Sequence, residues 1–165
     1  GGSIAKISGN EGNHFRGQAK VFESEEQFII DLEDNKISKG DVLVIRNQGP
    51  KGGPGMPEML KPSSALVGAG LSNHVALITD GRWSGGSSGF LVGHIVPEAY
   101  ENGPIAYIEN GDYININAIN NTINLEVSPD ILNKRKPNKI NKQLSPYLNK
   151  YTKLVNNASN GCITN

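Results

Sequence analysis

The sequence predicts a β-rich α/β fold. Its apolar runs are short and are interrupted by 20 glycines and 9 prolines, which favours several strands over long helices. Residues 42–46 and 75–79 are mainly apolar runs of the kind found in buried strands. Residues 113–116 and 123–127 alternate apolar and polar side chains, as half-buried strands do. The chain has 165 residues, enough for a hydrophobic core, and we expect a single domain over residues 1–165.

The first third of the chain is expected to hold three strands and one helix. Residues 4–7 and 18–22 show alternation and β-branched side chains, which predict strands. Ser24-Glu-Glu-Gln predicts a helix that ends near residue 34, because the serine can cap it and the acids suit the positive end of the helix dipole. The buried strand at 42–46 follows.

The middle of the chain is expected to begin with helix and to continue with a strand. Residues 57–70 have Pro57 at a favourable first-turn position and a loosely periodic apolar face, which predicts helix. Pro62 is expected to split this segment into two short helices. The strand at 75–79 comes next. Residues 87–92 are compatible with the start of a helix or with a returning strand.

The last third is expected to contain a small antiparallel meander followed by short helices. Asn-Gly is the strongest short hairpin signal, and it stands between two alternating segments here. The expected elements are strands at 105–108, 113–116 and 123–127, turns at Asn110-Gly111 and Asn120-Asn121, a short helix after Ser128 with Pro129 at its first position, a loop over 134–146 and a final helix over 147–155.

Composition and charge argue against several classes of function. Sixteen basic residues balance sixteen acidic ones, so no overall field would attract nucleic acid or an acidic membrane. No segment approaches the roughly 18 apolar residues of a membrane span, and the first residues do not resemble a signal peptide. Cys162 is the only cysteine, which excludes an internal disulfide or an iron–sulfur cluster within this chain. We expect a reducing intracellular compartment: the cytoplasm of a bacterium, or a plastid or mitochondrion of a eukaryote.

Two glycine-dense loops stand out as a candidate site. The first glycine loop, residues 49–59, reads Gly-Pro-Lys-Gly-Gly-Pro-Gly-Met-Pro-Glu-Met and contains Glu58. The second glycine loop, residues 80–89, reads Asp-Gly-Arg-Trp-Ser-Gly-Gly-Ser-Ser-Gly and contains Ser84. Glycine allows positive φ and lets backbone approach a ligand closely, at an entropic cost that a pure scaffold would avoid.

Known glycine motifs do not explain these loops. Neither loop contains the Gly-Lys-Ser/Thr of a P-loop or a dinucleotide fingerprint between a strand and a helix. Ser84 lies outside the Gly-x-Ser-x-Gly pattern of a nucleophile elbow. His14, His74 and His94 are far apart and form no metal-binding spacing, and we interpret His94 as a packed, hydrogen-bonded side chain.

Glu58 and Ser84 each have a structural and a functional interpretation. Glu58 could simply complement the dipole in the first turn of a helix, or it could be an oxygen ligand for a divalent cation such as Mg²⁺. Ser84 could form a turn in a glycine bend. Alternatively, a hydroxyl beside a cation loses its proton more easily and could act as a base.

Seven strings of the sequence resemble the C-terminal domain of the dihydroxy-acid dehydratase family. The two glycine loops carry the resemblance together with Gly93-His-Ile-Val-Pro-Glu, and it extends almost from end to end. Further strings are Gly2-Ser-Ile-Ala-Lys-Ile with Phe15-Arg-Gly-Gln-Ala-Lys-Val-Phe-Glu, Asn110-Gly-Asp-Tyr-Ile, and Ala158-Ser-Asn-Gly-Cys-Ile-Thr. Sugar-acid and phosphogluconate dehydratases share the Gly-Met-Pro-Glu and Ser-Gly core. The continuation Gly85-Gly-Ser-Ser-Gly-Phe is closer to the branched-chain amino-acid enzyme.

The resemblance implies a fold and a reaction. The fold is the swivelling β/β/α domain, a small barrel-like β core flanked by short helices. The reaction removes water from a 2,3-dihydroxy acid and gives a 2-oxo acid, with an iron–sulfur cluster as Lewis acid and Mg²⁺ holding the substrate. Glu58 matches the family's C-terminal Mg²⁺ ligand, and Ser84 matches the residue that takes the C2 proton as an alkoxide. Gly85, Gly86 and Ser87 are the implied substrate-binding residues.

The resemblance also implies partners. The other metal ligands and the cluster cysteines belong to an N-terminal domain outside these 165 residues, so the isolated chain is expected to fold but to be inactive. A homodimer of the full-length enzyme is the family expectation. Alternatives are a sugar-acid or phosphogluconate dehydratase domain and a separate docking subunit without activity of its own. Trp83 stands where the family more often has Phe, and Ser88 where it often has His.

Overall fold

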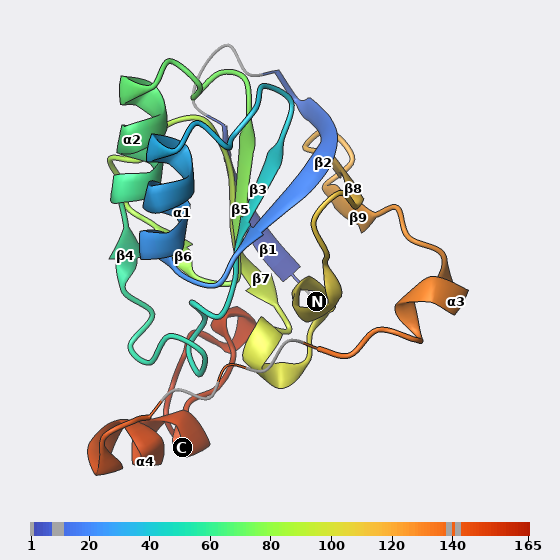
Figure 1. Ribbon diagram of the computed structural model, residues 1–165. Helices are drawn as coiled ribbons and strands as arrows, with labels where there is room; N and C mark the ends of the chain where they lie inside the picture. The colour runs from blue at the N-terminus through green and yellow to red at the C-terminus, as the bar shows by residue number, and fades with distance from the viewer. Residues whose placement is uncertain (1, 8–11, 138–139, 141–142) are drawn as a thin grey trace.

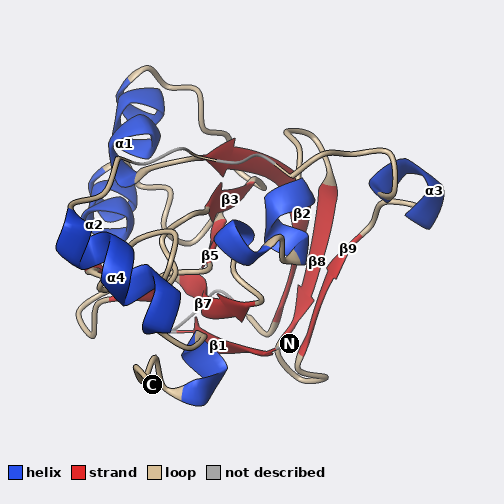
Figure 2. Cartoon of the chain, turned by 90° about the horizontal axis from the view of Figure 1, so that it is seen from below, coloured by secondary structure: helices blue, strands red, loops and turns tan. Residues whose placement is uncertain are grey.

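The chain folds around one seven-stranded, curled sheet. The computed structural model describes residues 2–7, 12–137, 140 and 143–165. The strands of the sheet are β1 (Gly2–Ile7), β2 (His14–Phe22), β3 (Val42–Ile45), β5 (Ala76–Thr79), β7 (Phe90–Val96), β8 (Tyr113–Asn117) and β9 (Thr122–Leu125). Their order is β1-β7-β5-β3-β2-β8-β9, and the sheet curls into a half-barrel (Figures 1 and 2). The expected β-rich α/β fold with a barrel-like core is confirmed.

The centre of the sheet is parallel and its two sides are antiparallel. β3 pairs in parallel with β2 and β5, and β5 pairs in parallel with β7. β1 runs antiparallel to β7, while β8 runs antiparallel to both β2 and β9. The central strands β3 and β5 are buried along their whole length. This explains why their sequences are almost continuously apolar, since parallel strands are covered on both faces.

Two hydrophobic clusters occupy the two faces of the sheet. Helices α1 (Glu25–Glu33) and α2 (Lys61–Gly68) cover one face (Figure 1). The cluster on this side includes Phe22, Phe28, Leu43, Leu66 and Leu77. The cluster inside the half-barrel includes Val42, Val44, Ile78, Phe90 and Ile114. The alternation along β3 and β5 sends neighbouring side chains to opposite clusters, as the period of two in a strand requires.

The expected helices at 24–34, after Ser128 and at 147–155 are confirmed. The Ser24 side chain accepts a hydrogen bond from Gln27 N at 3.2 Å, so it caps α1 as expected. The remaining helices are α3 (Pro129–Leu132), α4 (Pro146–Leu154) and the 3₁₀ segments η1 (Ala99–Glu101), η2 (Pro104–Tyr107) and η3 (Ala158–Asn160).

The expectation of helix over residues 57–70 was wrong in its first part. Glu58 and Met59 form the short strand β4 (Glu58–Met59), which pairs in parallel with β6 (Arg82–Trp83). Glu58 therefore does not lie in the first turn of a helix. Pro62 also does not divide the segment: it lies in the first turn of α2, where its missing N–H costs no hydrogen bond.

The expected strand at 105–108 was also wrong. Residues 104–107 form η2, and Arg46 Nη1 lies within hydrogen-bonding distance of the carbonyls of Ile105, Ala106 and Ile108 at 3.0–3.3 Å. These carbonyls are therefore unavailable to a strand partner. Asn110-Gly111 does not close a hairpin with that segment, because the strand after it, β8, pairs with β2. The second expected hairpin is confirmed, with Asn121 at φ +52° between β8 and β9.

The open choice for residues 87–92 is resolved as a strand, since β7 begins at Phe90. In the expected loop over 134–146, the described residues before α4 form neither helix nor strand, and residues 138–139 and 141–142 lie outside the described part. Within the described ranges, no helix is both long and apolar enough to cross a membrane.

Candidate active site

The two glycine loops lie side by side because β4 and β6 pair. In this short parallel ladder Glu58 is the partner of Arg82, and Met59 is the partner of Trp83. The backbone N–H of Ser84 extends the contact by donating to Met59 O at 3.0 Å. Glu58 and Ser84, which the sequence singled out separately, are thereby held on adjacent segments.

Side chains on the two faces of the ladder have different surroundings. The Arg82 Nη1 atom lies 3.3 Å from Glu58 Oε1, and Arg82 Nε donates to Met56 O at 2.7 Å. The Glu58 side chain is 51% exposed, so a ligand can reach it. Met59 and Trp83 face the other way, into the cluster beneath α1 and α2. The ladder thus presents a charged face outward and anchors itself through an apolar one.

Ser84 begins a tight turn. Its Oγ accepts a hydrogen bond from Gly86 N at 3.3 Å, and its carbonyl accepts one from Ser87 N at 3.0 Å. Ser87 is buried, and its hydroxyl donates to Met59 O at 3.2 Å. Gly85 and Gly86 are exposed beside Ser84. Ser87 therefore supports the turn, whereas Ser84, Gly85 and Gly86 are the members that a substrate can reach.

Lys6 reaches this turn from a distant part of the chain. It lies on β1, and its Nζ donates to the carbonyl of Gly85 at 2.6 Å. Among the described residues, no carboxylate forms an ion pair with Lys6. The ammonium group thus fixes the carbonyl of Gly85, the residue that follows Ser84 in the sequence. Sequence reasoning missed Lys6, because only the pairing of β1 with β7 brings it to the second glycine loop.

The first glycine loop is held by two buried carboxylates. Both Glu98 oxygens accept backbone hydrogen bonds, from Lys51 N at 2.8 Å and from Gly52 N at 2.7 Å. Asp80 accepts hydrogen bonds from Asn47 N at 3.1 Å and from Gln48 N at 2.9 Å. Neither carboxylate is exposed to solvent. Sequence reasoning did not assign these two acids, although Asp80 directly follows a buried strand and Glu98 ends the string that begins at Gly93.

Glycines in the two loops are required mainly by contacts within the protein. A Cβ at Gly49 would lie 2.6 Å from Glu98 Oε2, and a Cβ at Gly81 would lie 2.6 Å from Gln48 Cβ. A Cβ at Gly85 would meet nothing within 4 Å. The missing side chains therefore let Gly49 pack against Glu98, and let Gly81 of the second loop pack against Gln48, which directly precedes the first loop.

A family model for the C-terminal part of dihydroxy-acid/6-phosphogluconate dehydratases matches residues 1–162. The chain belongs to this family. Relatives named dihydroxy-acid dehydratase occur in Francisella tularensis subsp. novicida (58% identity over 166 residues) and Flavobacterium psychrophilum (56% over 166 residues). Another occurs in Lactococcus lactis subsp. lactis (56% over 167 residues). Each alignment covers 99% of this chain and 29–30% of the relative. The dehydratase domain thus spans about 30% of the length of the curated relatives it matches.

Burial shifts the protonation of the acids behind the site of this dehydratase domain. Desolvation raises the pKa of Glu98 to about 7, although the amides of Gly52 and Lys51 oppose the shift. Burial also raises the pKa of Asp80, again against its backbone hydrogen bonds. His94 is half-buried, its backbone N–H donates to Gly81 O at 2.8 Å, and burial with the nearby Arg82 lowers its pKa.

The dehydratase domain offers one carboxylate, Glu58, as a ligand for a divalent cation at this site. Carboxylate oxygen is a preferred donor for Mg²⁺, which takes one or two carboxylates from a protein, and Glu58 is exposed enough to serve. The guanidinium of Arg82 is a competing cation at 3.3 Å. Within the described ranges no group of three or more His, Cys, Asp or Glu side chains could hold a metal ion. The residues therefore fit a single ligand to Mg²⁺ and not a complete site.

Cys162 packs behind the first glycine loop. Its thiol donates to the Met56 sulfur at 3.8 Å, and burial raises the pKa of the thiol. A raised pKa disfavours the thiolate, which is the form that binds metals. An iron–sulfur cluster is held by several thiolates, so the single cysteine of this chain does not fit one.

Proposed function

We propose that the chain is the C-terminal domain of a dihydroxy-acid dehydratase of branched-chain amino-acid synthesis. The full-length enzyme would convert 2,3-dihydroxy-3-methyl acids to 2-oxo acids. The observation that carries the proposal is the β4–β6 ladder, which holds an exposed carboxylate, Glu58, and a reachable hydroxyl, Ser84, on adjacent segments. The names of the relatives supply the reaction class.

In the proposed reaction Ser84, as an alkoxide, removes the proton from C2 of the substrate. The electrons of the C2–H bond form a C2=C3 double bond while the C3–O bond breaks, and the departing hydroxide takes a proton from solvent and leaves as water. The resulting enol gives the 2-oxo acid when its hydroxyl proton is lost and C3 is protonated. The Ser84 proton returns to solvent. Lys6, bonded to the neighbouring Gly85 carbonyl, places a positive charge near the serine and favours its ionised form.

Glu58 would contribute one oxygen ligand to Mg²⁺, and Gly85 and Gly86 would line the substrate. Bound Mg²⁺ supplies Lewis-acid stabilisation of negative charge on the substrate oxygens. An iron–sulfur cluster, if the enzyme carries one, is held by residues outside this chain. The proposed partners are accordingly an N-terminal region of the same protein, a small dihydroxy acid and a second copy of the full-length enzyme. The proposed compartment is reducing and intracellular.

The first test replaces the proposed base. In the full-length enzyme Ser84→Ala should abolish turnover and leave the cluster absorbance and the Mg²⁺ content near those of the unchanged protein. Ser64→Ala, an exposed serine on α2, is the matched control and should keep full activity. Activity of Ser84→Ala within tenfold of the unchanged enzyme would show that Ser84 is not the base.

The second test concerns the proposed metal ligand. Glu58→Gln keeps the shape of the side chain and removes its charge, so it should raise the Mg²⁺ concentration for half-maximal activity by orders of magnitude. Glu33→Gln at the end of α1 should leave that concentration unchanged. An unaltered Mg²⁺ requirement in Glu58→Gln contradicts the assignment.

The third test concerns the substrate class. Turnover of a branched dihydroxy acid should exceed turnover of sugar acids and of 6-phosphogluconate. Faster turnover of either of the latter would favour the related dehydratases instead. If a cluster-bearing protein is fully active without this chain, the chain has only a docking role.

A further inference from the structure

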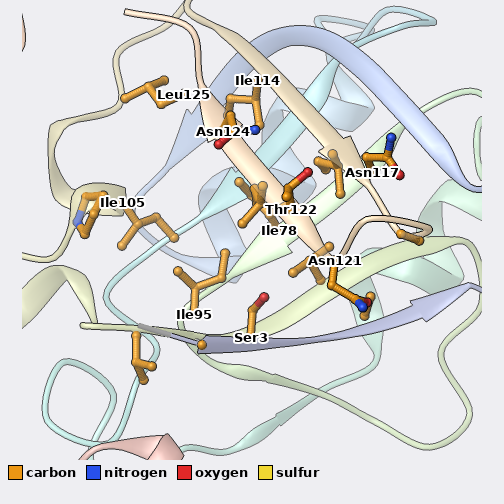
Figure 3. Close-up of a pocket in the computed structure, with 18 of the residues that line it drawn as sticks. Ser3, Ile78, Ile95, Ile105, Ile114, Asn117, Asn121, Thr122, Asn124 and Leu125 are labelled. Atoms are coloured by element: carbon orange, nitrogen blue, oxygen red, sulfur yellow. The ribbon is translucent and has the colours of Figure 1, made fainter. Parts of the chain in front are cut away.

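The half-barrel is open along one side and contains an apolar groove of about 600 Å³. Figure 3 shows this barrel groove between β1 and the β8–β9 pair, where the buried side chains of Ile78, Ile105 and Ile114 line it. Ser3 and Thr122 lie on opposite walls. None of the residues that line the groove is an acid or a base. The groove therefore suits an uncharged, largely apolar occupant better than an ionised metabolite.

Two sheet edges border the barrel groove. β1 and β9 are the terminal strands of the sheet, so in the described part of the chain each has a neighbour on one side only. Exposed edges invite pairing with other strands, and native proteins usually cover or pair them. On β1, Ser3 and Ala5 face the groove and are exposed to solvent. Exposed apolar patches often mark interaction sites, so an apolar groove between two free edges suits a covering segment.

The position of the first described residues indicates which segment could cover it. Gly2 and Ser3 line the groove, and Figure 2 shows the start of β1 beside the β8–β9 pair. The relatives are about three times longer, and the matched part belongs to a C-terminal domain family, so most of their remaining sequence precedes it. In a full-length protein of this kind, the upstream chain would enter this domain at the mouth of the groove.

We propose that the segment upstream of Gly1 in the full-length protein lies in the barrel groove in extended conformation. Its side chains would contact the apolar residues Ile78, Ile105 and Ile114, and its backbone would pair with the free edge of β1 or β9. An added strand gains its main-chain hydrogen bonds from the edge and its selectivity from alternate side chains. This segment would complete the barrel and attach the domain to the preceding region along a second line, remote from Glu58 and Ser84.

A photocrosslinking experiment on the full-length protein tests the occupant. Benzoylphenylalanine replaces Thr122 on the groove wall in one variant and Asn120, in the adjacent turn but not among the groove-lining residues, in the control. After irradiation, the Thr122 variant should crosslink within one chain to a peptide less than about 20 residues upstream of Gly2, because extended chain covers about 3.3 Å per residue. The control should not crosslink to that peptide.

Three outcomes would overturn the proposal. They are a crosslink from Thr122 to a distant part of the same chain, a crosslink between two chains that identifies a second copy as the occupant, and the absence of any crosslink specific to Thr122.

A stability measurement provides an independent readout. Ala5→Leu adds apolar volume on the groove side of β1. In a filled groove it should lower the melting temperature of the full-length protein by several degrees, because overpacking a core is destabilising. In an empty groove the same change would leave the melting temperature unchanged or raise it, which would contradict the proposal. Ile4→Leu, on the opposite and exposed face of β1, is the control and should have little effect.

Discussion

Gly49→Ala is the sharpest perturbation of the first glycine loop. The added Cβ would lie 2.6 Å from Glu98 Oε2 and 2.8 Å from Glu98 Cβ and Cδ. Glu98 has no exposed surface and cannot turn toward solvent, and its oxygens are bound to Lys51 N and Gly52 N. Overpacking of this kind costs about 1–3 kcal/mol, and above about pH 7, where Glu98 is ionised, weakening its two hydrogen bonds adds about 1.5–3 kcal/mol. We expect a local destabilisation of about 3–5 kcal/mol.

Native-state hydrogen exchange on the full-length protein measures this loss directly. The amides of Lys51 and Gly52 should exchange about 140-fold to 4,000-fold faster in Gly49→Ala, since about 1.4 kcal/mol corresponds to a factor of ten. Gly68→Ala is the control: a Cβ there would meet nothing within 4 Å, and alanine favours helix. If the two variants exchange at equal rates at Lys51 and Gly52, the contact between Gly49 and Glu98 does not hold the loop.

Two further predictions concern charged groups at the site. Folded Glu98 keeps its proton up to pH about 7, whereas the unfolded carboxyl loses it near pH 4.5. Between these pH values the folded state binds more protons than the unfolded state. The free energy of unfolding therefore falls as pH rises, by up to about 3 kcal/mol. Glu98→Gln should remove this part of the slope in urea titrations at a series of pH values, and an unchanged slope would refute the role of Glu98. Lys6→Met should lower kcat about tenfold to 100-fold with little change in KM or melting temperature, because the Gly85 carbonyl loses its donor. Lys6→Arg should restore part of the rate and Lys20→Met should have no effect; a normal kcat in Lys6→Met would contradict the positioning role.

Local signals were sufficient for most of the sheet. The strands β3 and β5 could be predicted from their continuous apolar runs, because a strand that is buried on both faces needs apolar side chains at nearly every position. The segment at 105–108 failed for a long-range reason: its carbonyls bind the guanidinium of Arg46, which comes from the end of β3. Nothing within that segment indicates such a donor.

The candidate site was predictable in its parts and less so in its connections. Glu58 and Ser84 stood out in glycine-rich strings, but the strand that contains Glu58 exists only because β6 pairs with it. Helix propensity around Pro57 therefore gave the wrong local structure. Lys6 and Glu98 became visible only through contacts between segments far apart in the sequence.

The pairing of β4 with β6 fixes the separation of Glu58 and Ser84 within this one domain. Any displacement of this domain relative to a neighbouring domain would move both side chains together as one rigid body. Changes in domain closure can then alter how far the pair stands from groups elsewhere, but not the spacing within the pair. In the proposed reaction, the ladder would therefore fix the spacing between the Mg²⁺ ligand Glu58 and the base Ser84.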